Sequence, residues 1–421
     1  MLVEVTIGNY RSFKEKATLS LVASGYDKTT HENENVIPFE KFDLRLLKSA
    51  VLYGANASGK TKFFEGVGFL KNLALNSLMG NQVGKPINVH PFALDKDSVS
   101  KPSFFELVFT VNGNLYRYGL EVTHESVKSE WLFMKELRKE VKIFSKDEDG
   151  YFFHPTKFKQ GKILEKEKLL RENATILSTA SIFPNPIIEV VSNWFRKLHV
   201  LSGIEDSGYR GYTLNYCEDS NAAKKVIEFL NQADLDINEI QTTKYHPDEL
   251  PADIPQEILQ LIKRDFKEKN THLFGNVITK HVKYDELGRT IGHTEFKMEM
   301  DESSGTNKFF ALAGPLLDSL EKGNILFIDE LDAKMHPLLV QKIVELFHKG
   351  ENKSQLILNT HTTTLLDENL FRRDQIWFAE KDRYGCSTLF SLLEIKNTNR
   401  EANWQEKYLQ GRYGAIPYLR N

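Results

Sequence analysis

The chain has 421 residues, of which 41% are hydrophobic and 27% charged, and its formal net charge at pH 7 is -3. This length predicts two to three domains, or one domain with a large insertion, and the ordinary composition excludes a disordered chain. The slightly acidic balance argues against a generally basic coat for nucleic acid, although a local patch stays open. Only Cys217 and Cys386 are present, so neither a disulfide framework nor a cysteine zinc site is indicated.

Residues 1–7 alternate apolar and polar side chains, which is typical of a strand rather than of a signal peptide. No apolar run in the chain is long enough to span a bilayer. We therefore expect a soluble, cytoplasmic protein with no membrane partner.

The most informative stretch is 54–61, which fits the pattern G-x-x-x-x-G-K-[ST] at every constrained position. The apolar run 47–53 predicts a strand before it, and apolar spacing over 63–75 predicts a helix after it. Such a loop turns backbone N–H groups toward an anion, and the helix N-terminus adds partial positive charge. The order strand, glycine loop and helix therefore predicts a P-loop for ATP with Mg²⁺; a chance glycine-rich turn is the weaker alternative.

Within this motif Lys60 is expected to reach the outer phosphates and Thr61 to ligate Mg²⁺. The residues predicted to bind the nucleotide are Gly54, Asn56, Ala57, Ser58, Gly59, Lys60, Thr61 and Lys62.

The chain divides into three segments that differ in their predicted secondary structure. Residues 1–130 predict mainly strands around the P-loop helix, with a hairpin formed by 104–110 and 115–122 around an Asn-Gly turn. Residues 131–290 predict a mixed, helix-rich insertion lobe, with helical patterns over 187–198, 222–232 and 255–268. Residues 291–421 predict the second part of the ATPase head.

A basic and aromatic cluster within the insertion is the best candidate contact for nucleic acid or for a partner. We favour the plainer interpretation of a solvated charged face, because acidic residues interrupt the cluster. It comprises Lys157, Lys159, Lys162, Lys166, Lys168 and Arg171, with Phe152, Phe153 and Phe158 nearby.

Three motifs of the last segment complete the expected site. The turn 302–308 precedes a helical pattern over 309–320, and its N–H groups and hydroxyls suit phosphate oxygens. The apolar run 324–328 predicts a buried strand that carries Asp329 to the sheet edge as a magnesium ligand, while Glu330 is placed to act as general base toward water. The strand predicted over 354–360 ends at His361, which can hydrogen-bond a terminal phosphate.

In this order the motifs resemble the ABC-type ATPases of the SMC and RecF superfamily. The resemblance implies an α/β fold, namely an ABC-type P-loop ATPase head with a mixed sheet and a helix-rich insertion lobe. It further implies that Asp332 forms the D-loop, that His361 is the switch histidine and that Lys60, Glu330 and His361 are catalytic. Ser303, Ser304, Gly305 and Thr306 look like the signature motif, acting in trans, but they keep only the serine and one glycine of the transporter form Leu-Ser-Gly-Gly-Gln. No Q-loop glutamine is evident around 88–94.

A closer resemblance covers nearly the full chain and links it to the bacterial RloA-like ATPases, relatives of the OLD proteins. It is carried by the stretches 9–13, 54–61, 329–332, 336–337, 373–378 and 411–417. The resemblance implies anti-phage abortive infection together with a separate effector, of Toprim-type or another nuclease class. The tail after residue 330 has no D-x-D pair, so we expect any nuclease site on that partner.

The resemblance also implies a homodimer or higher homo-oligomer, in which ATP is sandwiched between the P-loop of one subunit and the signature turn of another. Two alternatives remain open at this stage. One is a RecF-like ATPase that clamps DNA, and the other is a nucleotide-holding scaffold that hydrolyses very slowly. The trigger, the effector and the stoichiometry above two are left undetermined.

Overall fold

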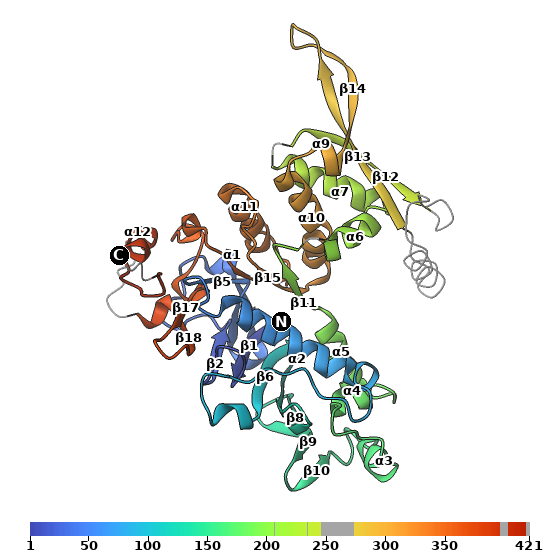
Figure 1. The fold of residues 1–421 in the computed structure, drawn as a ribbon, viewed down its shortest axis with the longest axis vertical. Helices are drawn as coiled ribbons and strands as arrows, with labels where there is room; N and C mark the ends of the chain where they lie inside the picture. The colour runs from blue at the N-terminus through green and yellow to red at the C-terminus, as the bar shows by residue number, and fades with distance from the viewer. Residues whose placement is uncertain (206, 234, 246–272, 396–402, 418–421) are drawn as a thin grey trace. The chain divides into compact units, whose positions relative to one another are not determined.

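The computed structural model describes residues 1–205, 207–233, 235–245, 273–395 and 403–417 (Figure 1). Its contacts divide the chain into two compact units. The first comprises residues 1–204, 319–332 and 340–421, and the second comprises 205–318 with 333–339. The helical pattern over 255–268 lies outside the described residues.

An antiparallel sheet forms one layer of the first unit, and its strand order is β10-β9-β8-β7-β6-β1-β2. The predicted hairpin is confirmed: Val111 pairs with Asn114, and Asn112 and Gly113 both have positive φ in the two-residue turn. The strands of this sheet are β1 (Leu2–Gly8), β2 (Ala17–Ser20), β6 (Ser103–Val111), β7 (Asn114–Val122), β8 (Val127–Lys135), β9 (Glu140–Asp147) and β10 (Gly150–Phe153).

A second sheet of the first unit has the order β11-β15-β16-β5-β17-β18, and its neighbouring strands are parallel except for β17 and β18. Parallel strands are covered on both faces, which is why β5, β15 and β16 read as nearly continuous apolar runs. Its strands are β5 (Ser49–Tyr53), β11 (Leu198–Ser202), β15 (Ile325–Asp329), β16 (Gln355–Asn359), β17 (Ile376–Lys381) and β18 (Ser387–Ser391); β3 (Val36–Phe39) and β4 (Leu44–Leu47) form a separate pair.

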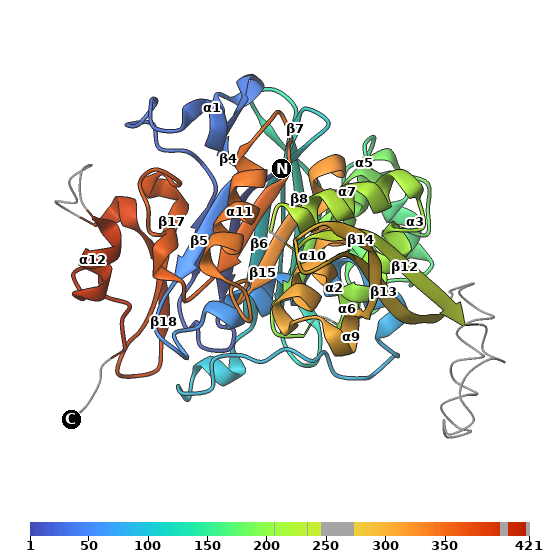
Figure 2. The same ribbon diagram turned by 90° about the horizontal axis from the view of Figure 1, so that it is seen from above.

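Helix α2 (Lys60–Gly80) packs against strands of both large sheets of this unit. Figure 2 shows strands of both sheets from above, among them β5 and β15 of the parallel one and β6 and β8 of the antiparallel one. Phe63, Val67, Leu70 and Ala74 recur at helical spacing and are buried. Each large apolar side chain buried in this way contributes roughly 1.5–3 kcal/mol. The helix that follows the P-loop is therefore held firmly between two layers.

The remaining helices of the first unit lie around these sheets. They are α1 (Glu32–Asn35), α3 (Gly161–Lys166), α4 (Ile176–Ala180), α5 (Pro186–Arg196), α12 (Trp404–Leu409) and α11 (Pro337–His348), whose first residues group with the second unit. The 3-10 turns are η1 (Glu40–Phe42), η2 (Ser98–Ser100), η3 (Thr363–Leu365), η4 (Arg373–Gln375) and η5 (Leu392–Glu394).

The second unit combines helices with a sheet of order β12-β13-β14. Phe229 stacks on Phe309 at 4.3 Å between ring centroids, which joins α7 to α10. In Figure 1 the hairpin β13–β14 projects from the helices of its own unit. The elements are α6 (Ser207–Tyr216), α7 (Ser220–Asn231), β12 (Ile237–Tyr245), β13 (Leu273–Tyr284), β14 (Thr290–Lys297), α9 (Met298–Asp301) and α10 (Ser304–Lys322), whose last turn groups with the first unit.

The predicted α/β class with a mixed sheet is confirmed. The two compact units, however, do not begin and end at the predicted domain boundaries, residues 130 and 290. Strand β8 pairs with β7 along its whole length, and β9 pairs with β8, so residues 131–153 extend the first sheet instead of beginning a helical lobe. The charge-dense stretch 135–140 contains the turn between these strands. The charged residues of this stretch therefore belong to a solvated turn and do not indicate a domain boundary.

Candidate nucleotide-binding site

The glycine loop connects the carboxyl end of β5 to the first residue of α2. Ala57 has a φ of 61° and Gly59 a φ of 110°, so the backbone turns through left-handed conformations. A Cβ on Gly59 would lie 2.6 Å from Ser387 Oγ, so glycine is required there by both conformation and space. This is the backbone shape that points successive N–H groups inward.

Lys60 is buried at the start of α2, and its Nζ donates to the carbonyl oxygens of Gly54 at 2.7 Å and Ala55 at 3.1 Å. Burial lowers the pKa of Lys60, while Glu330 and Asp329 act in the opposite direction. The amine therefore lies inside the loop and within the electrostatic reach of both predicted acids.

Thr61 and Asp329 meet although 268 residues separate them in the sequence. The hydroxyl of Thr61 donates to Asp329 Oδ1 at 3.0 Å, and Asp329 ends β15. One strand, β16, lies between β15 and the P-loop strand β5. The parallel arrangement brings the carboxyl ends of β5 and β15 to the same sheet edge.

These two oxygen groups fit Mg²⁺, which prefers one or two protein oxygens and completes its shell with waters and phosphate oxygens. Among the residues that the structure describes, no cluster of three or more His, Cys, Asp or Glu side chains forms a metal cage. The donor set is thus suited to a metal shared with a bound triphosphate.

Asn359 connects the two acids, and sequence reasoning missed it. Its Nδ2 donates to Asp329 Oδ1, and its Oδ1 accepts a hydrogen bond from the backbone N–H of Glu330. Glu330 has a φ of 51°, an uncommon conformation for a residue with a side chain and one that costs energy. The sequence did contain one indication of this role, because Asn359 is an amide residue at the end of β16, the parallel strand next to β15.

Gly203 was also missed, and it packs directly beneath the acidic turn. Its N–H donates to the carbonyl of Asp329 at 2.6 Å, and a Cβ there would lie 2.1 Å from the carbonyl oxygen of Glu330. No local pattern identifies this glycine, because its constraint comes from β15 approaching the end of β11.

His361 and Asp332 are joined through the backbone. Asp332 Oδ2 accepts from the N–H of His361 at 3.0 Å and from Thr362 Oγ1 at 3.1 Å. Burial and the charge of Lys60 lower the pKa of His361, so its imidazole is biased toward the neutral form. A neutral imidazole can both donate and accept hydrogen bonds.

A pocket of about 1020 Å³ opens over the loop, and it gathers most of the predicted residues: Asn56, Ala57, Ser58, Gly59, Lys60, Thr61, Lys62, Glu330 and His361 line it. Arg11, Ser12, His90 and Lys381 line it as well and were not assigned by sequence reasoning. The stretch around 88–94, where no Q-loop glutamine was found, supplies a histidine and Phe92 instead.

Three hydroxyls near the loop have unused hydrogen-bonding capacity. The Oγ atoms of Ser12, Ser58 and Ser387 are buried and have no hydrogen-bond partner among the described residues. Those of Ser12 and Ser387 both lie against Gly59. Because a buried polar group without a partner is costly, such a cluster is typical of a site that receives a polar ligand.

The four residues of the predicted signature lie at the start of α10, in the second unit. Ser303 Oγ accepts from the N–H of Thr306 at 3.0 Å and thus caps the helix. Glu302, just before them, accepts from Thr279 Oγ1 at 2.6 Å and lies 2.7 Å from His281 Nε2. Ser303 and Ser304 are exposed, while Thr306 is buried.

Two stretches that carry the closer resemblance have structural roles. Arg372, next to the stretch 373–378, is fully buried and pairs with Asp374 at 2.9 Å. In the stretch 411–417, the N–H of Ala415 donates to Glu380 at 3.2 Å and its carbonyl accepts from Tyr408. Both stretches stabilise the region around β17.

The loop, the acidic strand end and the parallel order of their strands define a P-loop ATPase domain of mixed α/β fold. Residues 49–367 match the family described as "AAA domain, putative AbiEii toxin, Type IV TA system". The match covers more than half of the chain, and the chain belongs to this family.

Two solved structures of SMC heads are similar at low identity. One is the "SMC head domain from Thermotoga maritima", with 11% identity, a TM-score of 0.39 and coverage of 93% of this chain and 98% of that one. The other is the "Crystal structure of the SmcHead bound to the C-winged helix domain of ScpA", with 12% identity, a TM-score of 0.44 and coverage of 93% and 97%. No curated protein sequence matches. Among the described residues, no helix has both the length and the apolar character needed to cross a membrane.

Proposed function

We propose that this protein binds Mg-ATP in the pocket over residues 54–61 and hydrolyses it to ADP and phosphate. The observation that carries the proposal is the 3.0 Å contact between Thr61 and Asp329, made by parallel strands from distant parts of the chain. The buried hydroxyls beside Gly59 and the strained backbone of Glu330 support the same site.

In this proposal each residue has a positional role. Lys60 turns from the loop carbonyls to the outer phosphates, while Thr61 and Asp329 hold the metal. When bound, Mg²⁺ supplies charge neutralisation for the phosphates. Glu330 orients and deprotonates the attacking water, and Asn359 fixes the direction of the acidic turn. His361 donates a hydrogen bond to the terminal phosphate.

We further propose that two copies assemble around the nucleotide, with the signature turn of one copy facing the P-loop of the other. The exposed Ser303, which caps the 19-residue helix α10, and the exposed Ser304, its first residue, support this, because N–H groups at the start of a helix attract phosphate oxygens. ATP binding would then close the assembly and hydrolysis would open it.

The biological proposal is that this cycle holds and releases a separate toxic effector, of nuclease class, in anti-phage abortive infection. The family description, which names a putative toxin and a Type IV toxin-antitoxin system, supports a role of this kind. The finer relationship to RloA-like and OLD-related ATPases stays a prediction, as does a cytoplasmic location.

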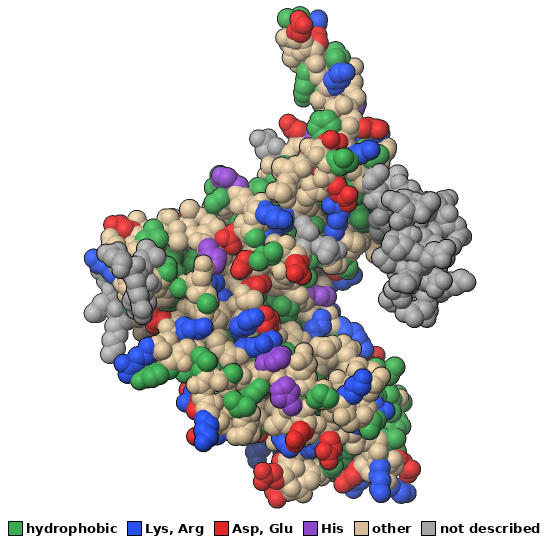
Figure 3. All heavy atoms as spheres, in the orientation of Figure 1, with side chains coloured by type: hydrophobic (Ala, Val, Ile, Leu, Met, Phe, Trp, Pro, Cys, Tyr) green, Lys and Arg blue, Asp and Glu red, His purple; other side chains and the backbone are tan. Residues whose placement is uncertain are grey.

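The alternative of a DNA clamp has weaker support. Phe153 and Phe158, which belong to the basic and aromatic cluster, are buried in the core and are not available to stack on bases. Lys157 is paired with Glu136 at 2.9 Å. Over the face drawn in Figure 3, basic and acidic side chains are interspersed instead of forming one basic surface.

Mg-ATP titration tests the proposed function directly. Wild type should bind Mg-ATP and release phosphate, whereas Lys60→Ala should lose binding by roughly a hundredfold, since a charge-assisted contact with phosphate is removed. Lys159→Ala is the matched control, because Lys159 is exposed and lies outside the pocket. Equal binding by wild type and Lys60→Ala contradicts the proposal.

A further inference from the structure

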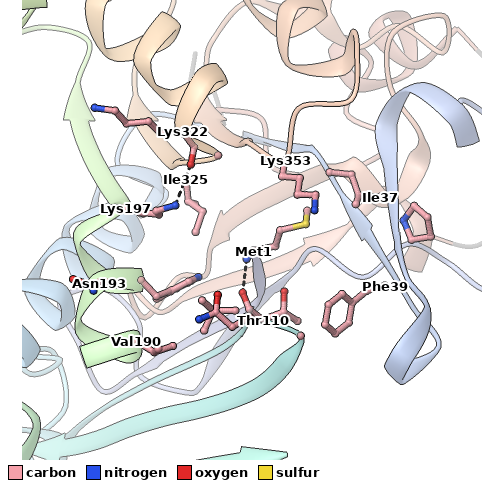
Figure 4. A pocket seen from close by; sticks show the side chains of 16 residues that line it. Met1, Ile37, Phe39, Thr110, Val190, Asn193, Lys197, Lys322, Ile325 and Lys353 are labelled. Atoms are coloured by element: carbon pink, nitrogen blue, oxygen red, sulfur yellow. Dashed lines mark hydrogen bonds between the residues drawn. The ribbon is translucent and has the colours of Figure 1, made fainter. Parts of the chain in front are cut away.

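A second pocket of the first unit, of about 570 Å³, lies at the opposite edge of the parallel sheet from the P-loop (Figure 4). It is lined at the amino ends of β11, β15 and β16, and the last two of these strands lead at their carboxyl ends to the acids and His361. Lys197 directly precedes β11, Ile325 begins β15, and Lys353 lies just before β16. Five strand residues span about 16 Å, so this pocket is separate from the nucleotide site.

The charged side chains that line this pocket are all positive. Among the described residues that line it, the charged side chains are Lys197, Lys322 and Lys353, and none is acidic. Figure 4 shows Lys197 and Lys353 on opposite sides of Met1, with the Lys197 amine directed toward the carbonyl of Lys322 and the Lys353 amine turned away from Lys197. Lys197 Nζ donates to the carbonyl of Lys322 at 3.1 Å, which fixes its position at the rim. Three lysines and no acidic residue around one pocket, in a chain of net charge -3, favour an anion.

The walls add aromatic and aliphatic surface. Phe39, Val190 and Ile325 supply apolar surface, and Trp194 lines the pocket with a buried Nε1 that has no hydrogen-bond partner among the described residues. The pocket thus combines positive charge with aromatic and aliphatic walls.

We propose that this pocket binds a nucleoside phosphate, with its phosphate beside the lysines that line the pocket and its flat base against the apolar wall. Lysine binds phosphate as a point charge, and a volume of this size suits one small ligand. The source of the ligand is a free nucleotide or the phosphorylated end of a nucleic-acid strand. The proposal does not depend on ATP hydrolysis at the P-loop.

The test uses the full chain with Lys60→Ala, so that binding at the P-loop does not obscure the second pocket. The probe is fluorescent N-methylanthraniloyl-AMP, followed by anisotropy. In this background Lys353→Glu and Lys197→Met should each raise the dissociation constant at least about tenfold, whereas Lys353→Arg should preserve binding. Lys159→Glu carries the same charge change on an exposed site outside both pockets and should leave binding within about twofold.

Competition experiments distinguish the two sources of the ligand, a free nucleotide and the phosphorylated end of a strand. Displacement by AMP indicates a free nucleotide, and displacement by a 5′-phosphorylated oligonucleotide but not by its unphosphorylated form indicates a strand end. Thermal melting of every variant distinguishes lost binding from lost folding, which matters for Lys197 because it bonds to the end of α10. Absence of probe binding to the folded Lys60→Ala protein, or equal binding by the Lys353→Glu and Lys159→Glu proteins, overturns the proposal.

Discussion

The P-loop pocket and the signature turn differ in how much of their hydrogen-bonding capacity is already used. Around Gly59 the hydroxyls of Ser12, Ser58 and Ser387 have no partner among the described residues. At the start of α10, Ser303 caps the helix and Glu302 is engaged by Thr279 and His281.

The P-loop pocket is therefore stabilised when a polar ligand binds, whereas the signature turn is already stable without a ligand. A buried hydroxyl without a partner costs about 1–3 kcal/mol, which a polar ligand can recover. A capped helix start has no such deficit, so its contribution to a ligand must come from exposed N–H groups and from its placement. We therefore expect substitutions in the P-loop pocket to change binding or chemistry, and substitutions at the turn to change assembly-dependent activity.

The largest expected effect is at Glu330. Glu330→Gln should lower the rate of ATP hydrolysis by about 10²–10⁴-fold while Mg-ATP binding is retained, because the water loses its base and the binding groups remain. Phosphate release and nucleotide titration measure the two quantities separately. Glu351→Gln, an exposed change of the same chemistry, is the control, and turnover at the wild-type rate by Glu330→Gln would refute the proposed role.

Gly203→Ala should displace the acidic turn, since the added Cβ would lie 2.1 Å from the carbonyl of Glu330. Overpacking of this kind costs about 1–3 kcal/mol, so both the melting temperature and the hydrolysis rate should fall. Gly208→Ala is the matched control, because a Cβ there meets nothing within 4 Å. If both variants behave alike, the turn does not depend on its packing against β11.

Glu302→Gln tests the signature turn. The amide retains one acceptor but weakens the contacts with Thr279 and His281, so the turn should lose its fixed position. We expect hydrolysis to fall on the order of tenfold, with unchanged Mg-ATP affinity of the isolated protomer. Stimulation of activity by protein concentration should weaken in parallel. A loss of nucleotide affinity instead would remove the distinction between the two regions.

The effect expected to be smallest at neutral pH, and to grow only with acid, is a pH dependence of the first unit. Burial, followed by the charge of Lys48, lowers the pKa of His348 to about 3. The unfolded chain therefore binds more protons than the folded one between about pH 6.5 and 3, so the stability is fully present above pH 6.5 and is lost as pH falls through this window. Melting temperatures of wild type should fall more steeply with acid than those of His348→Gln; parallel curves would contradict this assignment. The limiting slope is about 1.4 kcal/mol per pH unit.

Many of the structural elements and site motifs could be predicted from local sequence patterns. The strand, loop and helix around 54–61, the strand ending at Asp329, and the helices at 186–196 and 220–231 were all recognisable, because each depends on neighbours within a few residues. The hairpin at 103–122 was recognisable for the same reason, since an Asn-Gly turn fixes its own register. The strands β8 to β10 were not, because their alternating pattern was hidden by charge in the turn between them.

The sequence by itself determined the loop chemistry and the acids, since a glycine's conformational freedom and a carboxylate's charge belong to the residue wherever it lies. Only the tertiary structure decided that Asn359 bridges the two acids, that Gly203 must lack a side chain, and that Lys197 and Lys353 flank one pocket. These facts arise from strands that are distant in sequence and parallel in space, and no interaction within a single segment encodes which strand ends will meet.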